Sequence, residues 1–219
     1  RAPVTWRELL AAAEARVGAS DARRLAARAS GYGVGELVLH RDEVVTPRVE
    51  SFFAAMVDRR KAGEPLQYVL GHWGFRHLEL FVDPRVLIPR PETETVVDVA
   101  LAELAGLRLD RPPTVLDLGT GSGAIALALA TEVPGATVWA VDRSPDALAV
   151  ARANVAGVGG YAATRVRLVE GSWFEPLPAG LQFDLVVANP PYVAESDELP
   201  AEVADWEPTG ALIAGPDGT

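Results

Sequence analysis

The sequence predicts an α/β fold in which a mostly parallel sheet follows a small bundle of helices. Three observations support this prediction: helical patterns over residues 1–60, a glycine-rich turn between a strand and a helix near residue 120, and later apolar strands that end at polar residues. Strands that alternate with helices form parallel sheets. The chain has 219 residues, which is enough for one or two domains.

The composition and net charge exclude several classes of protein and of binding site. Hydrophobic residues make up 49% and charged residues 23%, as in an ordinary globular chain. The net charge of −10 argues against direct binding of nucleic acid, which requires a basic surface. The absence of cysteine excludes disulfides and thiolate metal sites, and no other residues suggest a metal site. Because no membrane-length apolar run or secretory signal is found, we expect a cytoplasmic protein without a membrane partner.

Residues 1–65 are expected to form an N-terminal helical domain. Thr5 and Glu8 have the spacing of a capping box, and Gly18 ends the first helix. Further helical segments are expected from Ser20 to Ala29, near Val34 to Leu39, and from Pro47 onward. The domain holds no catalytic constellation, so it is either an accessory domain or a docking module for a protein substrate.

Residues 66–90 are expected to connect this domain to a third segment, residues 91–219. Apolar residues at Phe75, Leu78, Leu80 and Val82 suggest a β-hairpin. The sequence Ile88–Glu94 closes the connector, and its prolines stiffen the backbone and begin a helix. Arg90 and Glu92 could act there as helix caps and surface ion pairs, or in a ligand site.

A glycine-rich turn follows the first strand of the expected sheet. Val115–Leu118 has the character of a strand, and Ala124–Ala130 that of a helix packed on it. The turn between them consists of Gly119, Thr120, Gly121, Ser122 and Gly123. Its glycines would let the backbone approach a ligand closely. The same residues also fit the dinucleotide fingerprint, so the turn alone leaves the class of cofactor open.

A carboxylate at the end of the second expected strand is another cofactor signal. Asp142 follows Thr137–Val141, where a carboxylate can accept hydrogen bonds from both ribose hydroxyls of a nucleoside cofactor. The alternative role for Asp142 is to cap the helix that begins near Ser144. A third strand, Val166–Glu170, follows later in the chain.

The sequence Asn189-Pro190-Pro191-Tyr192 follows a fourth expected strand, Leu181–Ala188, which we take to be buried and central. Two prolines donate no backbone hydrogen bond, so the strand has to end at Asn189. The side-chain oxygen of Asn189 and the carbonyl oxygen of Pro190 could each accept one hydrogen of the same NH2 group. That NH2 group would lie against the face of the Tyr192 ring. The alternative is an ordinary proline-rich loop.

Together these motifs resemble one family. Asn189-Pro190-Pro191-Tyr192 is similar to the catalytic motif of methyltransferases that act on glutamine amides or on adenine N6. With the glycine turn and Ile88–Glu94, nearly the whole chain resembles the protein-(glutamine-N5) methyltransferases of peptide chain release factors, known as PrmC or HemK. The resemblance implies a Rossmann-like class I core that uses S-adenosyl-L-methionine and yields S-adenosyl-L-homocysteine.

The resemblance also implies roles for individual residues. The cofactor would be bound by Gly119, Thr120, Gly121, Ser122, Gly123, Asp142, Trp173 and Asn189, with Trp173 beside the adenine. Asn189, Pro190 and Tyr192 would be catalytic, and together with Pro191 they would hold the glutamine of a Gly-Gly-Gln motif. Residues 1–65 would help to engage the release factor. A class I sheet has seven strands, and the residues after Tyr192 are too few for three more, so we expect the C-terminal part of the sheet to be missing.

The sequence also allows three other functions. An adenine-N6 methyltransferase of DNA or RNA would use the same Asn189 motif, although the net charge of −10 and the lack of a basic insert argue against it. A glutamine methyltransferase of a ribosomal protein would differ in the partner alone. A non-catalytic nucleotide-binding protein would transfer no methyl group at all.

Overall fold

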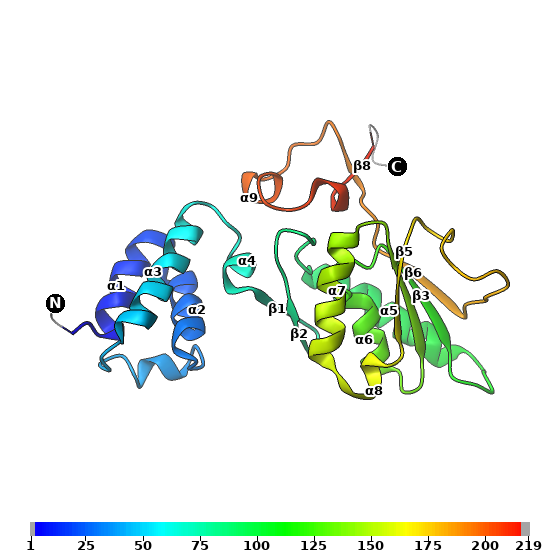
Figure 1. The fold of residues 1–219 in the computed structure, drawn as a ribbon, viewed down its shortest axis with the longest axis horizontal. Coiled ribbons are helices and arrows are strands. Elements are labelled where there is room, and N and C mark those ends of the chain that lie inside the picture. Colours follow the sequence, from blue (N-terminus) through cyan, green and yellow to red (C-terminus); the bar gives the residue numbers. More distant parts are fainter. Residues whose placement is uncertain (1–2, 216–219) are drawn as a thin grey trace. The chain divides into compact units, whose positions relative to one another are not determined.

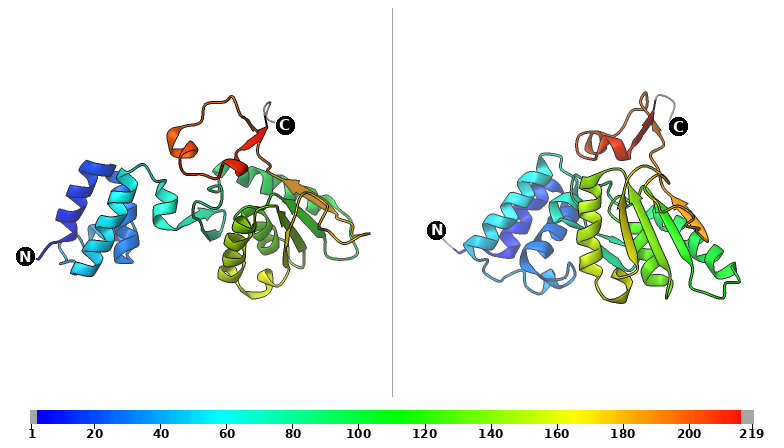
Figure 2. Two further views of the ribbon diagram at one scale, coloured as in Figure 1. Left: turned by 45° about the horizontal axis from the view of Figure 1, so that its top comes forward. Right: turned by 45° about the vertical axis from the view of Figure 1, so that its right-hand side comes forward.

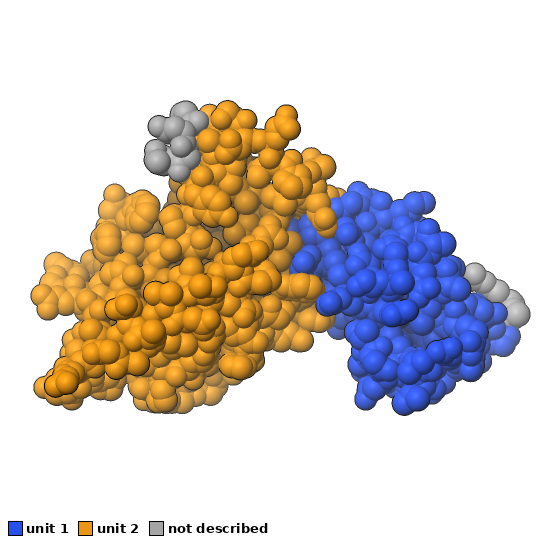
Figure 3. Space-filling model, turned by 180° about the vertical axis from the view of Figure 1, so that it is seen from behind, with its two compact units in different colours: residues 1–70 blue, residues 71–219 orange. Residues whose placement is uncertain are grey.

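The computed structural model describes residues 3–215. The chain divides into two compact units, residues 1–70 and residues 71–219, which Figure 3 shows in different colours. Residues 66–70 belong to the first unit by their contacts, and the hairpin that follows belongs to the second. A separate connector domain over residues 66–90 therefore stays a prediction.

The first unit is a bundle of short helices (Figure 1). It contains α1 (Trp6–Val17), α2 (Ala19–Ser30), η1 (Glu36–Val38), α3 (Pro47–Lys61) and α4 (Leu66–Leu70). The expected capping box of α1 is confirmed, because Thr5 and Glu8 each bond the other's backbone N–H through their side chains. α2 begins one residue before the expected Ser20 and has no side-chain cap. The rings of Trp6 and Phe53 meet edge to face in the buried centre, with 5.7 Å between centroids.

The second unit begins with the predicted hairpin and continues into a parallel sheet. The hairpin strands are β1 (His72–Phe75) and β2 (Leu78–Phe81). The sheet consists of β3 (Thr114–Leu118), β4 (Thr137–Asp142), β5 (Val166–Glu170) and β6 (Leu185–Ala188) in the order β5-β4-β3-β6, all parallel. The expected strands over residues 115–118, 137–141 and 166–170 are confirmed.

The main core lies between the sheet and the helices of this unit (Figure 2). These helices are α5 (Pro91–Gly106), α6 (Ala124–Glu132), α7 (Pro145–Val158) and the short α8 (Gly160–Ala163). α6 consists mostly of alanine and leucine and is buried along most of its length, because small side chains let a helix lie close to strands. On the other face, Leu177 and Phe183 pack against a smaller cluster around Leu116.

The fourth strand of the sheet differs from its expectation in two ways. β6 begins at Leu185 rather than Leu181, and among the described residues it is an edge strand of the sheet rather than a central one. Val187 is buried, but Val186 is 45% exposed. The strand does end at Ala188, immediately before Asn189, as the two prolines require.

Residues 193–215 lie beyond the carboxyl ends of the strands (Figure 1). They form β7 (Val193–Ala194), α9 (Ala201–Ala204), η2 (Thr209–Ala211) and β8 (Ile213–Gly215), and β7 pairs in parallel with β8. In the described part of the chain, no helix has the length and apolar character required to cross a membrane.

Candidate active site

A cavity of about 830 Å³ lies in the second unit at the carboxyl edge of the sheet. This volume is typical of small-molecule sites. The loops after all four sheet strands contribute to its wall, which also contains residues 85–90 and parts of residues 208–214. Every residue that the sequence predicted for the site lines this cavity except Gly123, which is the N-cap of α6. The roles of these residues remain predictions.

The glycine turn presents open backbone to the cavity. Gly119 and Gly121 have φ angles of 72° and 56°, which favour glycine. A Cβ atom added at either residue would meet nothing within 4 Å, so a ligand could approach the backbone there. The N–H groups of Gly119 and Thr120 both donate to the Val141 carbonyl, which ties the turn to β4.

Asp142 connects the glycine turn to the start of α7. Its Oδ2 accepts a hydrogen bond from the Gly121 N–H at 2.8 Å, and its Oδ1 accepts from the Ser144 N–H at 2.9 Å. The N-cap of α7 is Ser144, whose hydroxyl accepts from the Ala147 N–H. A carboxylate oxygen can accept more than one hydrogen bond, so Asp142 keeps capacity for the hydroxyls of a ribose.

Asp117 is a buried carboxylate that the sequence analysis missed. Its Oδ2 accepts hydrogen bonds from the Thr120 hydroxyl at 2.6 Å and the Ala126 N–H at 3.2 Å. Its Oδ1 has no hydrogen-bond partner in the described structure. The pKa of Asp117 is raised to about 6, chiefly by burial and to a smaller extent by the negative charge of Asp142, although the two hydrogen bonds lower it. The available signal was an acidic residue inside the apolar strand Val115–Leu118.

Asn154 is a second missed residue, and it joins the hairpin to the glycine turn. From α7 it accepts a hydrogen bond from the Phe81 N–H at 2.7 Å and donates to the Phe81 carbonyl at 3.0 Å. It also donates to the Ser122 carbonyl at 2.8 Å. The side chain is buried and fully hydrogen-bonded, so it fixes Ser122 from behind the cavity wall. No sequence motif marks this position.

The side-chain amide of Asn189 has two differently bonded ends. Its Nδ2 donates to the Thr93 hydroxyl oxygen at 3.3 Å, whereas its Oδ1 has no partner within residues 3–215. Both Asn189 and Thr93 line the cavity, together with the 76% exposed Tyr192. The same wall contains Trp173, which is 56% exposed.

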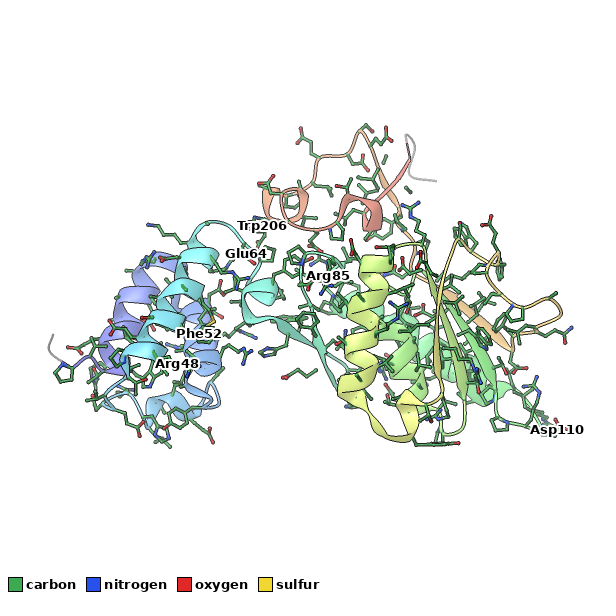
Figure 4. The ribbon with its side chains drawn as sticks, viewed as in Figure 1. Arg48, Phe52, Glu64, Arg85, Asp110 and Trp206 are labelled. Atoms are coloured by element: carbon green, nitrogen blue, oxygen red, sulfur yellow. The ribbon has the colours of Figure 1, made fainter. Side chains whose placement is uncertain are left out.

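Residues 85–90 form the wall that runs into α5. Arg85, labelled in Figure 4, begins this wall and pairs with Asp83 at 2.6 Å. Arg90 pairs with Glu207, which is buried, rather than forming the surface ion pair that the sequence suggested. It occupies the N-cap position of α5 but makes no side-chain cap.

Family models match both units of the chain. The model described as the PrmC N-terminal domain matches residues 4–71, and the one described as the methyltransferase small domain matches residues 96–205. Similar solved structures include a precorrin-6y C5,15-methyltransferase from Geobacter metallireducens, 27% identical over 49% of this chain and 52% of its own, with a TM-score of 0.38. The methyltransferase domain of METTL16 is 17% identical over 57% and 56% of the two chains, with a TM-score of 0.45.

Relatives in several bacteria bear the name release factor glutamine methyltransferase. The Burkholderia pseudomallei protein is 44% identical over 99% of this chain and 75% of its own length. The Rhodopirellula baltica protein is 43% identical over 91% of this chain and 68% of its own length. The Gloeobacter violaceus protein is 45% identical over 97% of this chain and 74% of its own length. The parallel sheet and the match to a methyltransferase domain give the chain a Rossmann-like class I fold. Because of its identity to these relatives, the chain belongs to the release factor glutamine methyltransferases.

Proposed function

We propose that this protein transfers a methyl group from S-adenosyl-L-methionine to the side-chain amide nitrogen, N5, of a glutamine. The substrate is the Gly-Gly-Gln motif of a peptide chain release factor, and the reaction takes place in the cytoplasm. The observation that carries the proposal is the unpartnered Oδ1 of Asn189 in a cavity shared with the glycine turn. The names of the relatives supply the class of substrate.

The residues around the cavity fit S-adenosyl-L-methionine. The turn Gly119–Gly123 offers open backbone, and Asp142 offers carboxylate oxygens for the ribose. Trp173 offers an exposed ring for the adenine. The carboxylates of Asp117 and Asp142 repel one another, and a cationic ligand would relieve that repulsion. When bound, the cofactor supplies an electrophilic methyl carbon attached to a positively charged sulfur.

The Asn189 motif is suited to hold the glutamine amide. Asn189 Oδ1 and the Pro190 carbonyl oxygen each accept one hydrogen of the substrate NH2 group, and the Tyr192 ring supports its plane. The two acceptor oxygens stabilise the positive charge that develops on the nitrogen during methyl transfer. An amide nitrogen is a weak nucleophile, so most of the acceleration has to come from positioning, which can supply about 7–11 kcal/mol. The nitrogen releases its proton after transfer, when it is acidic, so a strong base is not needed.

The shared name of the relatives favours glutamine over adenine as the acceptor. The net charge of −10 also favours glutamine, because an adenine in a nucleic-acid substrate would require a basic surface on the protein. A glutamine of a ribosomal protein would fit the same Asn189 geometry, so the experiment has to identify the partner.

The experiment incubates the protein with methyl-labelled S-adenosyl-L-methionine and a release factor. We expect label on the release factor, and none when the glutamine of its Gly-Gly-Gln motif is replaced by alanine. Parallel reactions contain ribosomal proteins, DNA or RNA. Label that persists without that glutamine, or that enters one of the other substrates instead, would reject the proposed function.

A further inference from the structure

Thr93 lies next to the Asn189 amide in the cavity wall. It occupies the first turn of α5, where its own N–H donates to the Arg90 carbonyl at 3.0 Å. The helix fixes its backbone, and the branching at Cβ restricts its side chain to few rotamers. The hydroxyl oxygen of Thr93 lies 3.3 Å from Asn189 Nδ2 and is half-buried. It is thus a rigidly mounted partner for one end of the amide.

The orientation of the Asn189 amide decides whether it can hold a substrate NH2 group. Its oxygen accepts hydrogen bonds and its nitrogen donates them, although the two ends have nearly the same shape. With Oδ1 toward the substrate, acceptor meets donor. With the amide turned by 180°, two NH2 groups would face one another, and neither could bond to the other.

We propose that Thr93 is a positioning residue, which accepts a hydrogen bond from Asn189 Nδ2 and thereby holds Oδ1 toward the glutamine amide. This inference rests on the proposed function. A hydroxyl both donates and accepts, so Thr93 could also bond the turned amide. With substrate present, however, the orientation with Oδ1 toward the substrate satisfies both ends of Asn189, and the turned orientation satisfies one. The 3.3 Å separation is long, as hydrogen bonds in a site without substrate often are.

The first test replaces Thr93 by valine, which keeps the branched shape and removes the hydroxyl. We expect kcat for the release factor to fall about tenfold, the value of one hydrogen bond in a half-buried site. KM for the release factor and the affinity for S-adenosyl-L-methionine should stay within about twofold, since Thr93 acts through Asn189. Thr93→Ser should restore most of the lost kcat. The matched control is Thr95→Val, because Thr95 is exposed on the same helix.

A double-mutant cycle separates this role from a general structural one. If Thr93 acts through Asn189, Thr93→Val should cause almost no further loss of single-turnover rate in an Asn189→Ala background. Independent, multiplying losses would overturn the proposal, as would a wild-type kcat in Thr93→Val or a loss confined to cofactor affinity. Thermal unfolding of each variant checks folding, and Thr93→Ala replaces the valine variant if that one unfolds.

Rejection of the role of Thr93 can be distinguished from rejection of the proposed function. If the unmodified enzyme does not label the Gly-Gly-Gln glutamine, the proposed function fails first. If it does label that glutamine and Thr93→Val does so at the same rate, the reaction stands and the role of Thr93 is rejected.

Discussion

Arg90 forms an ion pair with Glu207, a residue that lies 117 positions later in the chain. The Glu207 side chain is only 2% exposed, and its second oxygen accepts a hydrogen bond from the Ile88 N–H at 3.0 Å. Pro208 and Gly210, which follow Glu207 closely, line the cavity. The interaction therefore fastens one wall of the cavity to the turn that begins α5.

Replacing Glu207 by glutamine should loosen this wall. The variant leaves the Arg90 guanidinium without its anion and weakens the bond to Ile88, at a cost of about 1–3 kcal/mol. Arg90 is 36% exposed, so water limits the loss. Amide hydrogen exchange over residues 208–214 should become faster, and affinity for S-adenosyl-L-methionine should fall. The exposed Glu198 gives the control Glu198→Gln; equal exchange rates in the two variants would contradict this role for Glu207.

Asn189→Ala should lower the rate of the chemical step by about 10²-fold or more, like the loss of a hydrogen-bonding group from an oxyanion hole. The variant removes the Oδ1 acceptor from the cavity but leaves the glycine turn intact. Cofactor affinity should change much less than the rate. Single-turnover transfer to the release factor measures the first quantity, and calorimetry measures the second. A wild-type single-turnover rate would exclude Asn189 from the mechanism.

Asp142→Ala should weaken cofactor binding by roughly 1–3 kcal/mol, because hydrogen bonds to the ribose are lost and partners are left unpaired. The variant also releases the Gly121 and Ser144 N–H groups, so part of the loss would come from a less ordered turn. Asp142→Asn separates the effects, since its remaining oxygen can still bond one of these groups. Calorimetry that finds unchanged affinity in Asp142→Ala would remove this residue from the site.

The sequence correctly predicted the elements that are marked by short-range sequence patterns. The Thr5 capping box and the glycine turn have short-range patterns, and the structure contains both helices that they begin. The expected central position of β6 is not found among the described residues, where β6 lies at the edge of the sheet, because an apolar run of four or five residues does not reveal which strands will pair with it. Val186 is exposed and Val187 is buried because successive side chains of a strand point to opposite faces of the sheet, and Val187 is on the face that packs into the main core.

In the candidate site, too, local sequence patterns do not predict contacts between residues that are far apart in the chain. The cavity residues Gly119, Asp142 and Asn189 could be predicted because each ends or follows a strand, and parallel strands end at one edge of a sheet. Thr93 and Glu207 could not, since each acts on a residue about a hundred positions away in the chain. Such contacts depend on how loops close over the sheet, and no local motif encodes that closure.

Asp117 predicts a pH dependence of stability. Its pKa is raised in the folded protein, from an ordinary value of 3.8 to about 6, chiefly by burial. The folded state therefore binds this proton more tightly than the unfolded state does. The stability from the protonated Asp117 is fully present below about pH 4 and is lost as the pH rises to about 6. The loss should be on the order of 2–3 kcal/mol in the free energy of unfolding.

Asp117→Asn tests this dependence, because asparagine cannot ionise but can still accept from Thr120 or Ala126. Other carboxylates titrate in the same range, so the informative quantity is the difference in unfolding free energy between the variant and the wild type. That difference should shift in favour of the variant between pH 4 and pH 6 and stay constant above. Asp110, which Figure 4 labels and which is exposed, gives the control Asp110→Asn. Chemical denaturation at a series of pH values measures both, and a flat difference for Asp117→Asn would show that burial does not hold this proton in the folded state.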